Sequence, residues 1–344
     1  GTHMTTATII GLDLAKNVFH AHGASEAGAV VFRKKLSRSQ VLPFLSEQPK
    51  CIVAMEACAT AHGWAREIER LGHSPRLIPP QYVKPYVKRQ KNDMADAEAI
   101  AEAGSRPTMR FVEPKPEDQQ ISAMAYRTRQ MFIGQRTQTI NALRSHLAEH
   151  GVIAATNMCG LKKLSAMIED ETVSMPCKVR ELAHVYVDHI AQLTAQIAEM
   201  TGEMREMAKK SAVVKRLQTV PGVGLQTAMA VETFAPDPGC FSRGRDFSAW
   251  LGLVPRQNST GGKSRLGKVS KMGQVDIRSH LIRGAMSVIS AATRFGIKKG
   301  SWLERLLARK PKLVAAVTLA NRMARAIWAM LTKNEDYKNP EAVA

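Results

Sequence analysis

The sequence has few aromatic residues and no paired cysteines. Aromatic residues make up 5% of the 344 residues, too few for an extended platform on which the bases of single-stranded nucleic acid stack. The five cysteines form no CxxC pair, so we expect no structural zinc. Their odd number argues against a disulfide framework, so we expect the protein to function in a reducing cytoplasm. No apolar run approaches the ~18 residues that a membrane span needs, and no signal-peptide pattern is present.

Acidic residues are also scarce relative to basic ones. The chain has 49 Lys and Arg against 30 Asp and Glu, a net charge of +19 and a pI near 10.0. Residues 255–312 alone carry 14 basic against 2 acidic residues. Surfaces that are basic only for solubility usually mix both signs. We therefore expect a polyanionic partner and favour nucleic acid.

Four of the acidic residues occupy positions where a carboxylate is hard to explain structurally. Asp13 lies inside an apolar strand-like run, and Glu56 ends a second such run. Asp93 and Asp96 lie three residues apart at a predicted helix start and so share one helix face. Taken singly, each has an ordinary structural interpretation as a cap, a turn residue or part of a solvated helix face. Together they predict an oxygen-only site for Mg²⁺ or Mn²⁺ and phosphodiester chemistry.

The N-terminal third alternates strand-like and helical patterns, which predicts an α/β domain with a mainly parallel sheet. In such sheets the functional crevice lies at the carboxyl ends of the strands, where Asp13 and Glu56 fall. The predicted strands cover 6–14, 20–23, 29–35, 51–55 and 74–78, and the predicted helices 61–71 and 93–103.

The rest of the chain is predicted to be mainly helical. After a boundary at 114–116, residues 117–150 and 178–210 each form one long helix, and apolar residues near heptad spacing in the second predict an antiparallel pair or coiled coil. Residues 151–177 receive no secure assignment, and residues 273–333 are predicted to be helical.

Residues 217–228 have the pattern of a helix-hairpin-helix, in which Pro-Gly-x-Gly joins two helices. Gly222 and Gly224 let the backbone approach a ligand closely, and the N–H groups at a helix start can hold a phosphate without reading sequence. The structural alternative is an ordinary tight turn between two helices. The surrounding positive charge favours contact with a nucleic-acid backbone.

A loop is predicted at 257–268, where hydroxyl, glycine and basic residues gather. A hydroxyl flanked by basic residues can attack a phosphodiester and form a covalent link. The residues alone do not choose among four candidate nucleophiles: Ser259, Thr260, Ser264 and Ser270. The candidate phosphate-binding residues are Arg256, Lys263, Arg265, Lys268 and Lys271.

Several motifs resemble those of the DEDD-type insertion-sequence transposases, relatives of the pilin-gene invertase that are known as bridge-RNA-guided recombinases. Their order and spacing match over nearly the whole chain. In the N-terminal half they are 11–16 (Gly-Leu-Asp-Leu-Ala-Lys), 55–58 (Met-Glu-Ala-Cys) and 92–97 (Asn-Asp-Met-Ala-Asp-Ala). In the C-terminal half they are 220–224 (Val-Pro-Gly-Val-Gly), 250–256 (Trp-Leu-Gly-Leu-Val-Pro-Arg) and 270–273 (Ser-Lys-Met-Gly).

The resemblance implies an α/β RNase H-like (RuvC-like) N-terminal domain at 5–113, a helical coiled-coil middle at 114–210 and a mainly α C-terminal transposase domain with a helix-hairpin-helix at 211–338. It assigns metal binding and catalysis to Asp13, Glu56, Asp93 and Asp96. It also implies a serine nucleophile before the Ser-Lys-x-Gly motif. The spacing departs by one residue from other branches of the family, which leaves Ser259 or Thr260. Ten residues separate Ser259 from Ser270, which fits the family better, so we favour Ser259.

The resemblance further implies an RNA-guided DNA recombinase of the bacterial cytoplasm, associated with the nucleoid. A noncoding RNA encoded by the element pairs with double-stranded donor and target DNA, and the protein reads RNA shape and backbone. A homodimer assembles into a homotetramer on two DNAs, and different protomers contribute to one active site. No P-loop motif is present, so we expect no ATP requirement.

Two alternatives stay open. The first is a RuvC-like metal-dependent nuclease that hydrolyses DNA junctions with water. The second is a non-catalytic helix-hairpin-helix protein that binds nucleic acid and retains an idle acidic pocket.

Overall fold

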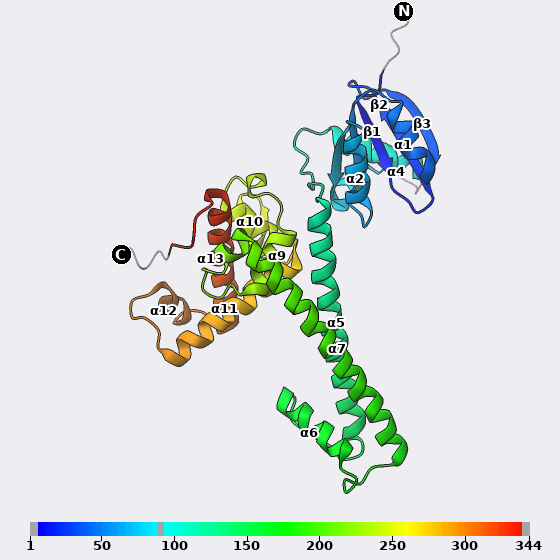
Figure 1. Ribbon diagram of the computed structural model, residues 1–344. Helices are drawn as coiled ribbons and strands as arrows, with labels where there is room; N and C mark the ends of the chain where they lie inside the picture. Colours follow the sequence, from blue (N-terminus) through cyan, green and yellow to red (C-terminus); the bar gives the residue numbers. More distant parts are fainter. Residues whose placement is uncertain (1–5, 88–92, 339–344) are drawn as a thin grey trace, which may run out of the picture. The chain divides into compact units, whose positions relative to one another are not determined.

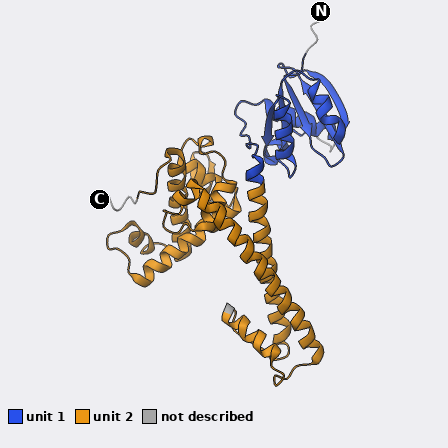
Figure 2. Ribbon diagram, in the orientation of Figure 1, with its two compact units in different colours: residues 1–120 blue, residues 121–344 orange. Residues whose placement is uncertain are grey.

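The computed structural model describes residues 6–87 and 93–338. The chain forms two compact units, residues 1–120 and 121–344 (Figure 2). The division falls inside the first turn of the long helix α5, which begins at Glu117.

Unit 1 is built on one five-stranded sheet with the strand order β3-β2-β1-β4-β5 (Figure 1). The strands are β1 (Ile9–Asp13), β2 (Val18–Ala24), β3 (Val30–Ser37), β4 (Ile52–Glu56) and β5 (Ser74–Ile78). β1, β2 and β3 pair antiparallel, whereas β4 pairs parallel with both β1 and β5. The expectation of a mainly parallel sheet is therefore wrong for half of the pairings. The connections at 14–17 and 25–29 are too short for a parallel crossover and permit only antiparallel turns.

Helices cover both faces of this sheet. They are η1 (Arg38–Gln40), α1 (Val41–Ser46), α2 (Ala61–Arg70), α3 (Pro80–Val83), η2 (Lys84–Tyr86) and α4 (Asp93–Ser105). Ile10 and Leu12 of β1 pack in one core with residues of α1 and α2, whereas Ile9 belongs to a second core with residues of α4. Because strand side chains alternate between faces, Gly11 and Asp13 lie on the same face as Ile9, the face that α4 covers.

Gly11 lets α4 lie almost in contact with the backbone of β1. A Cβ atom at Gly11 would lie 2.1 Å from the Ala97 carbonyl oxygen and 2.6 Å from the Ala101 nitrogen. Further along α4, a Cβ at Gly104 would lie 2.6 Å from the Ala54 Cβ of β4. Small residues on both surfaces therefore set the distance between helix and sheet. They bring the first turn of α4 next to the ends of β1 and β4.

Unit 2 begins with an antiparallel pair of long helices, α5 (Glu117–Ala148) and α7 (Cys177–Lys210). Arg129 Nε donates to Thr201 Oγ1 at 2.7 Å, and Arg136 Nη1 donates to Thr194 Oγ1 at 3.4 Å. The residue numbers of the bonded partners decrease on α7 as they increase on α5, so the two helices run in opposite directions. The expected antiparallel helical pair is confirmed. In sequence order, α6 (Met158–Glu169) follows α5 and precedes α7, in the segment that the sequence analysis left unassigned.

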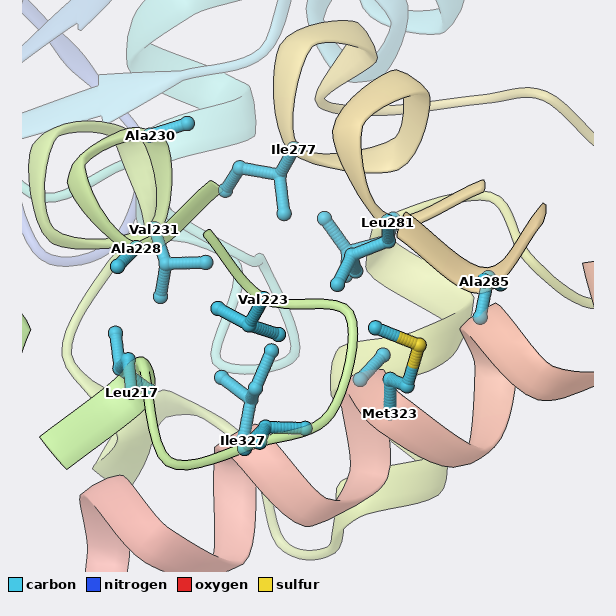
Figure 3. Packing of buried hydrophobic residues seen from close by; sticks show 14 of the residues in the cluster. Leu217, Val223, Ala228, Ala230, Val231, Ile277, Leu281, Ala285, Met323 and Ile327 are labelled. Carbon is cyan, nitrogen blue, oxygen red and sulfur yellow. The ribbon is translucent and has the colours of Figure 1, made fainter. Parts of the chain in front are cut away.

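A helical bundle with one β-hairpin forms the rest of unit 2. Its elements are α8 (Ala212–Leu217), α9 (Leu225–Phe234), η3 (Pro238–Cys240), α10 (Gly244–Trp250), β6 (Pro255–Thr260), β7 (Lys263–Val269), α11 (Val275–Phe295), α12 (Trp302–Leu307) and α13 (Lys312–Lys333). In Figure 3 the Val223 side chain, from the turn between α8 and α9, lies among buried residues of α11 and α13 such as Leu281 and Ile327. Within residues 6–87 and 93–338, none of the helices has both the length and the hydropathy of a membrane span.

A part-buried hydrogen bond joins the long helix α5 to the bundle. The Tyr126 hydroxyl of α5 shares a hydrogen bond with Nε2 of His280 on α11, and Tyr126 is almost fully buried. Burial raises the pKa of Tyr126 to about 12. Burial, followed by the nearby Arg283, lowers the pKa of His280 to about 4, while Asp276 acts in the opposite direction and Arg129 adds to the lowering. His280 is therefore neutral at physiological pH.

We expect Gly11→Ala to lower the free energy of unfolding of unit 1 by about 1–3 kcal/mol, the usual cost of an added methyl in a closely packed interior. Gly63→Ala is the matched control, because a Cβ at Gly63 in α2 would meet no atom within 4 Å. That change would leave the protein as stable or raise its stability by about 0.5–1 kcal/mol. Thermal unfolding of the two full-length variants measures this, and equal Tm values would contradict the tight contact between α4 and β1.

We expect His280 to make the folded protein sensitive to mild acid. A histidine in an unfolded chain has a pKa of about 6.5, whereas folded His280 has one of about 4. Between these values the unfolded chain binds more protons, so the stabilisation present above about pH 6.5 is lost as the pH falls towards 4. The loss of Tm from pH 7.5 to 4.5 would be smaller in His280→Gln than in wild type. It would be unchanged in His150→Gln, which alters an exposed histidine.

Candidate active site

The two strand carboxylates lie side by side on the α4 face of the sheet. β1 and β4 pair in parallel with Leu12 opposite Met55, so Asp13 and Glu56 occupy corresponding positions one residue further along. Both are partly buried. Both acids lie at the carboxyl ends of their strands, as the sequence predicted, and the register shows in addition that the two strands are adjacent.

The first turn of α4 brings two more carboxylates towards this edge. Asp96 is partly buried and Asp93 is exposed. Burial raises the pKa of Asp13, and the charges of Asp96 and, to a smaller extent, Asp93 raise it further. Acids in a first helical turn also stabilise the helix dipole, so these positions serve α4 itself as well. Asn92, which opens the sequence motif, lies outside the described residues.

The carboxylates of this group repel one another, and the fold nevertheless holds them close together. Burial and then the charge of Asp96 raise the pKa of Asp13, with a smaller effect from Asp93. Burial and then Asp13 and Asp96 raise the pKa of Glu56. Among residues 6–87 and 93–338, no group of three or more His, Cys, Asp or Glu side chains is arranged closely enough to hold a metal ion. The four carboxylates therefore influence one another electrostatically, and their side chains would have to move closer together to share one ion.

His20 is a neighbour of this cluster that the sequence did not single out. It lies opposite Asp13 in the antiparallel register of β1 and β2. Its charge lowers the pKa of Asp13, against the effect of the carboxylates, and its buried Nδ1 has no hydrogen-bond partner among the described residues. In the sequence, His20 is visible only as a histidine within an apolar strand. Its position beside Asp13 follows only from the strand register.

The segment predicted as a loop at 257–268 is a β-hairpin. β6 and β7 pair antiparallel, and the turn residues Gly261 and Gly262 have φ angles of +56° and +76°. Two successive positive φ angles characterise the type I′ turn that suits a two-residue hairpin. Nearly every side chain of the two strands is exposed. The sequence therefore lacked the alternation of apolar and polar residues that identifies a strand.

Ser259 lies next to the turn, on an exposed strand. It pairs across the hairpin with Ser264, while Thr260 pairs with Lys263. Alternation places Ser259 and Ser264 on one face of the hairpin and Thr260 on the other. The hydroxyl of Ser270, a further candidate nucleophile, is buried without a hydrogen-bond partner in the described structure. Solvent therefore reaches Ser259, Thr260 and Ser264, but not the Ser270 oxygen.

The basic residues of the hairpin divide between its two faces. Register and alternation place Lys263 and Arg265 with Thr260. Arg256 lies on that same face, because a Cβ at Gly267 would contact the Arg256 Cβ at 3.6 Å. Lys268 alternates to the face of Ser259. Three of the predicted phosphate-binding cations thus lie on the opposite face from Ser259.

A buried arginine fixes the base of the hairpin. Arg278 of α11 donates from Nη1 to the carbonyl oxygens of Leu251 at 3.0 Å and Met272 at 2.8 Å, one on each side of the hairpin. Close contacts at Gly252 and Gly273 bring the same two segments together. Lys271, one of the predicted phosphate-binding residues, follows β7 with a positive φ of 55°. An arginine on the apolar face of α11 was the sequence signal for this clamp.

The Pro-Gly-x-Gly segment forms the turn between α8 and α9. Gly222 has a φ of +84°, and a Cβ there would lie 2.7 Å from the Gly284 carbonyl oxygen of α11. A Cβ at Gly224, the residue that precedes α9, would meet no atom of the described residues within 4 Å. Gly222 is thus held against α11, whereas Gly224 borders open space.

We expect Asp13→Asn to raise the Tm of the metal-free protein at pH 7 by a few degrees. Asp13 has a raised pKa in the folded state. Above the pKa of an unfolded carboxyl, stability therefore falls as the pH rises through the raised folded value. Removing the charge removes that loss. Glu26→Gln, which alters an exposed carboxylate in the turn between β2 and β3, would leave the Tm unchanged. A Tm for Asp13→Asn below that of wild type would contradict the repulsion.

Comparisons with known proteins agree over both units. A family model described as "Transposase IS116/IS110/IS902 family" matches residues 214–297, and the DEDD transposase model of the IS110 group, described as "Transposase", matches residues 10–151. The chain is 44% identical to a "Probable family 20 transposase" of Pseudomonas aeruginosa, over 96% of this chain and 98% of that protein.

Two further relatives carry the names of insertion-sequence transposases. The transposase for insertion sequence element IS1328 of Yersinia enterocolitica is 39% identical, over 96% of this chain and 98% of that protein. The transposase for insertion sequence element IS1111A of Coxiella burnetii is 36% identical, over 97% and 92%. The chain therefore belongs to the IS116/IS110/IS902 family of insertion-sequence transposases.

Proposed function

We propose that this transposase is a DNA recombinase that cuts and rejoins strands through a covalent phosphoserine link at Ser259, together with Mg²⁺ or Mn²⁺ at the acidic cluster. The observation that carries the proposal is the gathering of Asp13, Glu56 and Asp96 near one edge of the sheet, where burial and then the charges of neighbouring carboxylates raise the pKa values of Asp13 and Glu56. A cluster of this kind is suited to a hard divalent cation.

The acidic cluster would hold the metal through the carboxylate oxygens of Asp13, Glu56, Asp93 and Asp96. The raised pKa values of Asp13 and Glu56 support the fit, because a bound cation would offset the repulsion from neighbouring carboxylates that, after burial, contributes to them. A divalent ion in such a site supplies positive charge that stabilises the entering and leaving oxygens of phosphoryl transfer. Burial of Asp13 and Glu56 would limit competition from water for their oxygens.

Ser259 would supply the nucleophile from its exposed position on β6. Its Oγ forms a bond to phosphorus as the bond from phosphorus to one deoxyribose oxygen breaks, and the proton lost by Oγ ends on the released oxygen. The Ser259–phosphate ester keeps the energy of the original bond. Attack by the hydroxyl of a new strand then rejoins DNA without ATP. The reaction draws on carboxylates of unit 1 and a serine of unit 2.

Nucleic-acid contacts would come from the basic residues of unit 2. Arg256, Lys263, Arg265, Lys268 and Lys271 surround the hairpin and its base and are suited to phosphates of DNA or RNA. The turn between α8 and α9 supports a helix-hairpin-helix, with Gly222 holding the turn and Gly224 at the start of α9 open to a phosphate. The strongly basic composition supports a guide RNA encoded by the element as well as donor and target DNA.

The sheet order and the helix pair support the larger assignments. The antiparallel strands β1–β3, continued by the parallel strands β4 and β5, support an RNase H-like (RuvC-like) domain at 5–113. The α5–α7 pair supports a coiled-coil region at 114–210, followed by the transposase domain at 211–338. Exposed apolar side chains along these helices, among them Met124 at 73% exposure and Val185 at 64%, support a homodimer that assembles into a homotetramer on two DNAs at the nucleoid.

We expect a denaturation-resistant protein–DNA adduct when the protein is mixed with Mg²⁺, element-end DNA and the flanking noncoding RNA. Ser259→Ala and Asp13→Ala would each reduce it by roughly three orders of magnitude or more, as the loss of an essential catalytic group does. Ser264→Ala is the matched control, because it removes an exposed hydroxyl from the same hairpin face. Gel electrophoresis with labelled DNA measures the adduct.

The same assay separates the alternatives. Adduct lost in Thr260→Ala but kept in Ser259→Ala would move the nucleophile by one residue. Cleavage without an adduct, unchanged by Ser259→Ala, would establish the hydrolytic RuvC-like nuclease. Binding with steep salt dependence and no strand breakage after Mg²⁺ is added would establish the non-catalytic protein. An adduct that forms equally well without the RNA would remove the guide RNA from the proposal.

A further inference from the structure

A cavity of about 700 Å³ lies in the C-terminal bundle, away from the hairpin. Residues of α10, α12 and α13, of the chain that follows α13 and of the turn between α8 and α9 line it. Its volume is within the range of roughly 300–1,000 Å³ that is usual for small-molecule and cofactor sites. All of its lining belongs to unit 2.

The cavity gathers flat aromatic side chains that are rare elsewhere in the chain. Trp302, Trp328 and Tyr337 line it, although the whole sequence contains only four tryptophans and five tyrosines. The Trp328 indole N–H donates to the Pro238 carbonyl oxygen at 3.1 Å, which fixes the ring in the wall. The scarcity of aromatic residues argues against an extended stacking platform, but three rings in one cavity suit a single base.

Positive charge accompanies these rings. The Arg322 guanidinium lies over the Trp302 ring, 4.6 Å from its centroid. Arg245 and Arg325 also line the cavity, and neither has an ion-pair partner within the described ranges. Arginine planes stack on bases, and unpaired guanidinium groups bind phosphate.

Each of the two acidic residues of the lining forms an ion pair, one with a lysine of the same segment and the other with an arginine of α8. Glu335 pairs with Lys338 at 2.7 Å, and Asp336 pairs with Arg216 at 3.8 Å. The backbone N–H of Tyr337 donates to Thr219 Oγ1 at 3.2 Å, which fixes this segment beside the turn that precedes α9. The cavity therefore keeps an excess of positive charge.

We propose that this cavity binds one unstacked nucleobase of a nucleic acid, with the flanking phosphates on Arg245 and Arg325. Aromatic rings and the Arg322 plane would stack the base, which supplies affinity without sequence preference. Val220 and Pro221 of the turn between α8 and α9 also line the cavity, so a strand bound at that turn, as proposed above, would lie beside the cavity. RNA and DNA share this chemistry. The inference does not depend on Ser259 or on the acidic cluster.

The test is equilibrium binding of the full-length protein to a labelled hairpin with one unpaired adenosine, in ribose and deoxyribose forms. The comparison probe carries an abasic position in place of that adenosine. We expect wild type to bind the bulged probe roughly tenfold more tightly than the abasic probe, as loss of one stacked base predicts. The sugar that shows the larger ratio identifies RNA or DNA as the source. Fluorescence anisotropy at fixed salt and without Mg²⁺ measures the ratio.

Variants link that ratio to the cavity. Arg322→Ala and Trp302→Ala would bring it close to one, whereas Trp302→Phe, which keeps a ring, would retain most of it. Arg309→Ala is the matched control, because Arg309 is exposed on the same bundle and does not line the cavity. Thermal unfolding of each variant identifies any loss of the fold, and Arg322→Ala with Trp302→Phe keeps the comparison valid if Trp302→Ala fails to fold.

Three outcomes would overturn the proposal. Equal affinity of wild type for the bulged and abasic probes would show that no base is bound. A ratio preserved in folded Arg322→Ala would place the base elsewhere. A change in the mass of the nucleic-acid-free protein on Arg322→Ala, measured by sedimentation, would show that a second copy of the chain occupies the cavity. Because the assay involves no cleavage, a failure of the phosphoserine mechanism would leave its result unchanged.

Discussion

The contact of α4 with β1 at Gly11 is the constraint on which the acidic cluster depends. With a side chain at Gly11, the carbonyl of Ala97 and the amide of Ala101 would have to move away. The first turn of α4 would then lie further from the strand ends, and Asp96 would lose its effect on Asp13 and Glu56. Repulsion among the carboxylates opposes this approach. Apolar packing of α4 residues such as Ile100 against the sheet holds them together.

The hairpin that carries Ser259 is positioned by a different kind of interaction. Its strands have almost no buried side chains, so hydrophobic packing contributes little to its position. Hydrogen bonds from buried Arg278 to two backbone carbonyls fix its base instead. A rigid base and an exposed tip are suited to a nucleophile that must reach a large, charged substrate. The acidic cluster thus depends on packing of α4 against the sheet, whereas the serine hairpin depends on hydrogen bonds to the backbone at its base.

Sequence periodicity predicted most of the regular elements, because apolar alternation and heptad spacing are local signals. The ends of β5 and the start of α4 fall where the pattern placed them, and the two long helices are confirmed. Strand direction was misjudged for β2 and β3, since short connections outweigh the α/β pattern. The polar hairpin at β6 and β7 had no apolar face, so no periodicity marked it.

The amino-acid sequence specifies the chemical groups available to this transposase: four carboxylates near strand and helix ends, hydroxyl and basic residues around 259, and a net charge suited to nucleic acid. Which of these groups share a surface depends on how the chain folds. Strand register placed His20 beside Asp13 and separated Ser259 from Arg256, Lys263 and Arg265. Three aromatic rings, from α12, from α13 and from the chain after α13, meet in one cavity for the same reason. Pairing and packing between distant segments are cooperative and leave no local pattern in the chain.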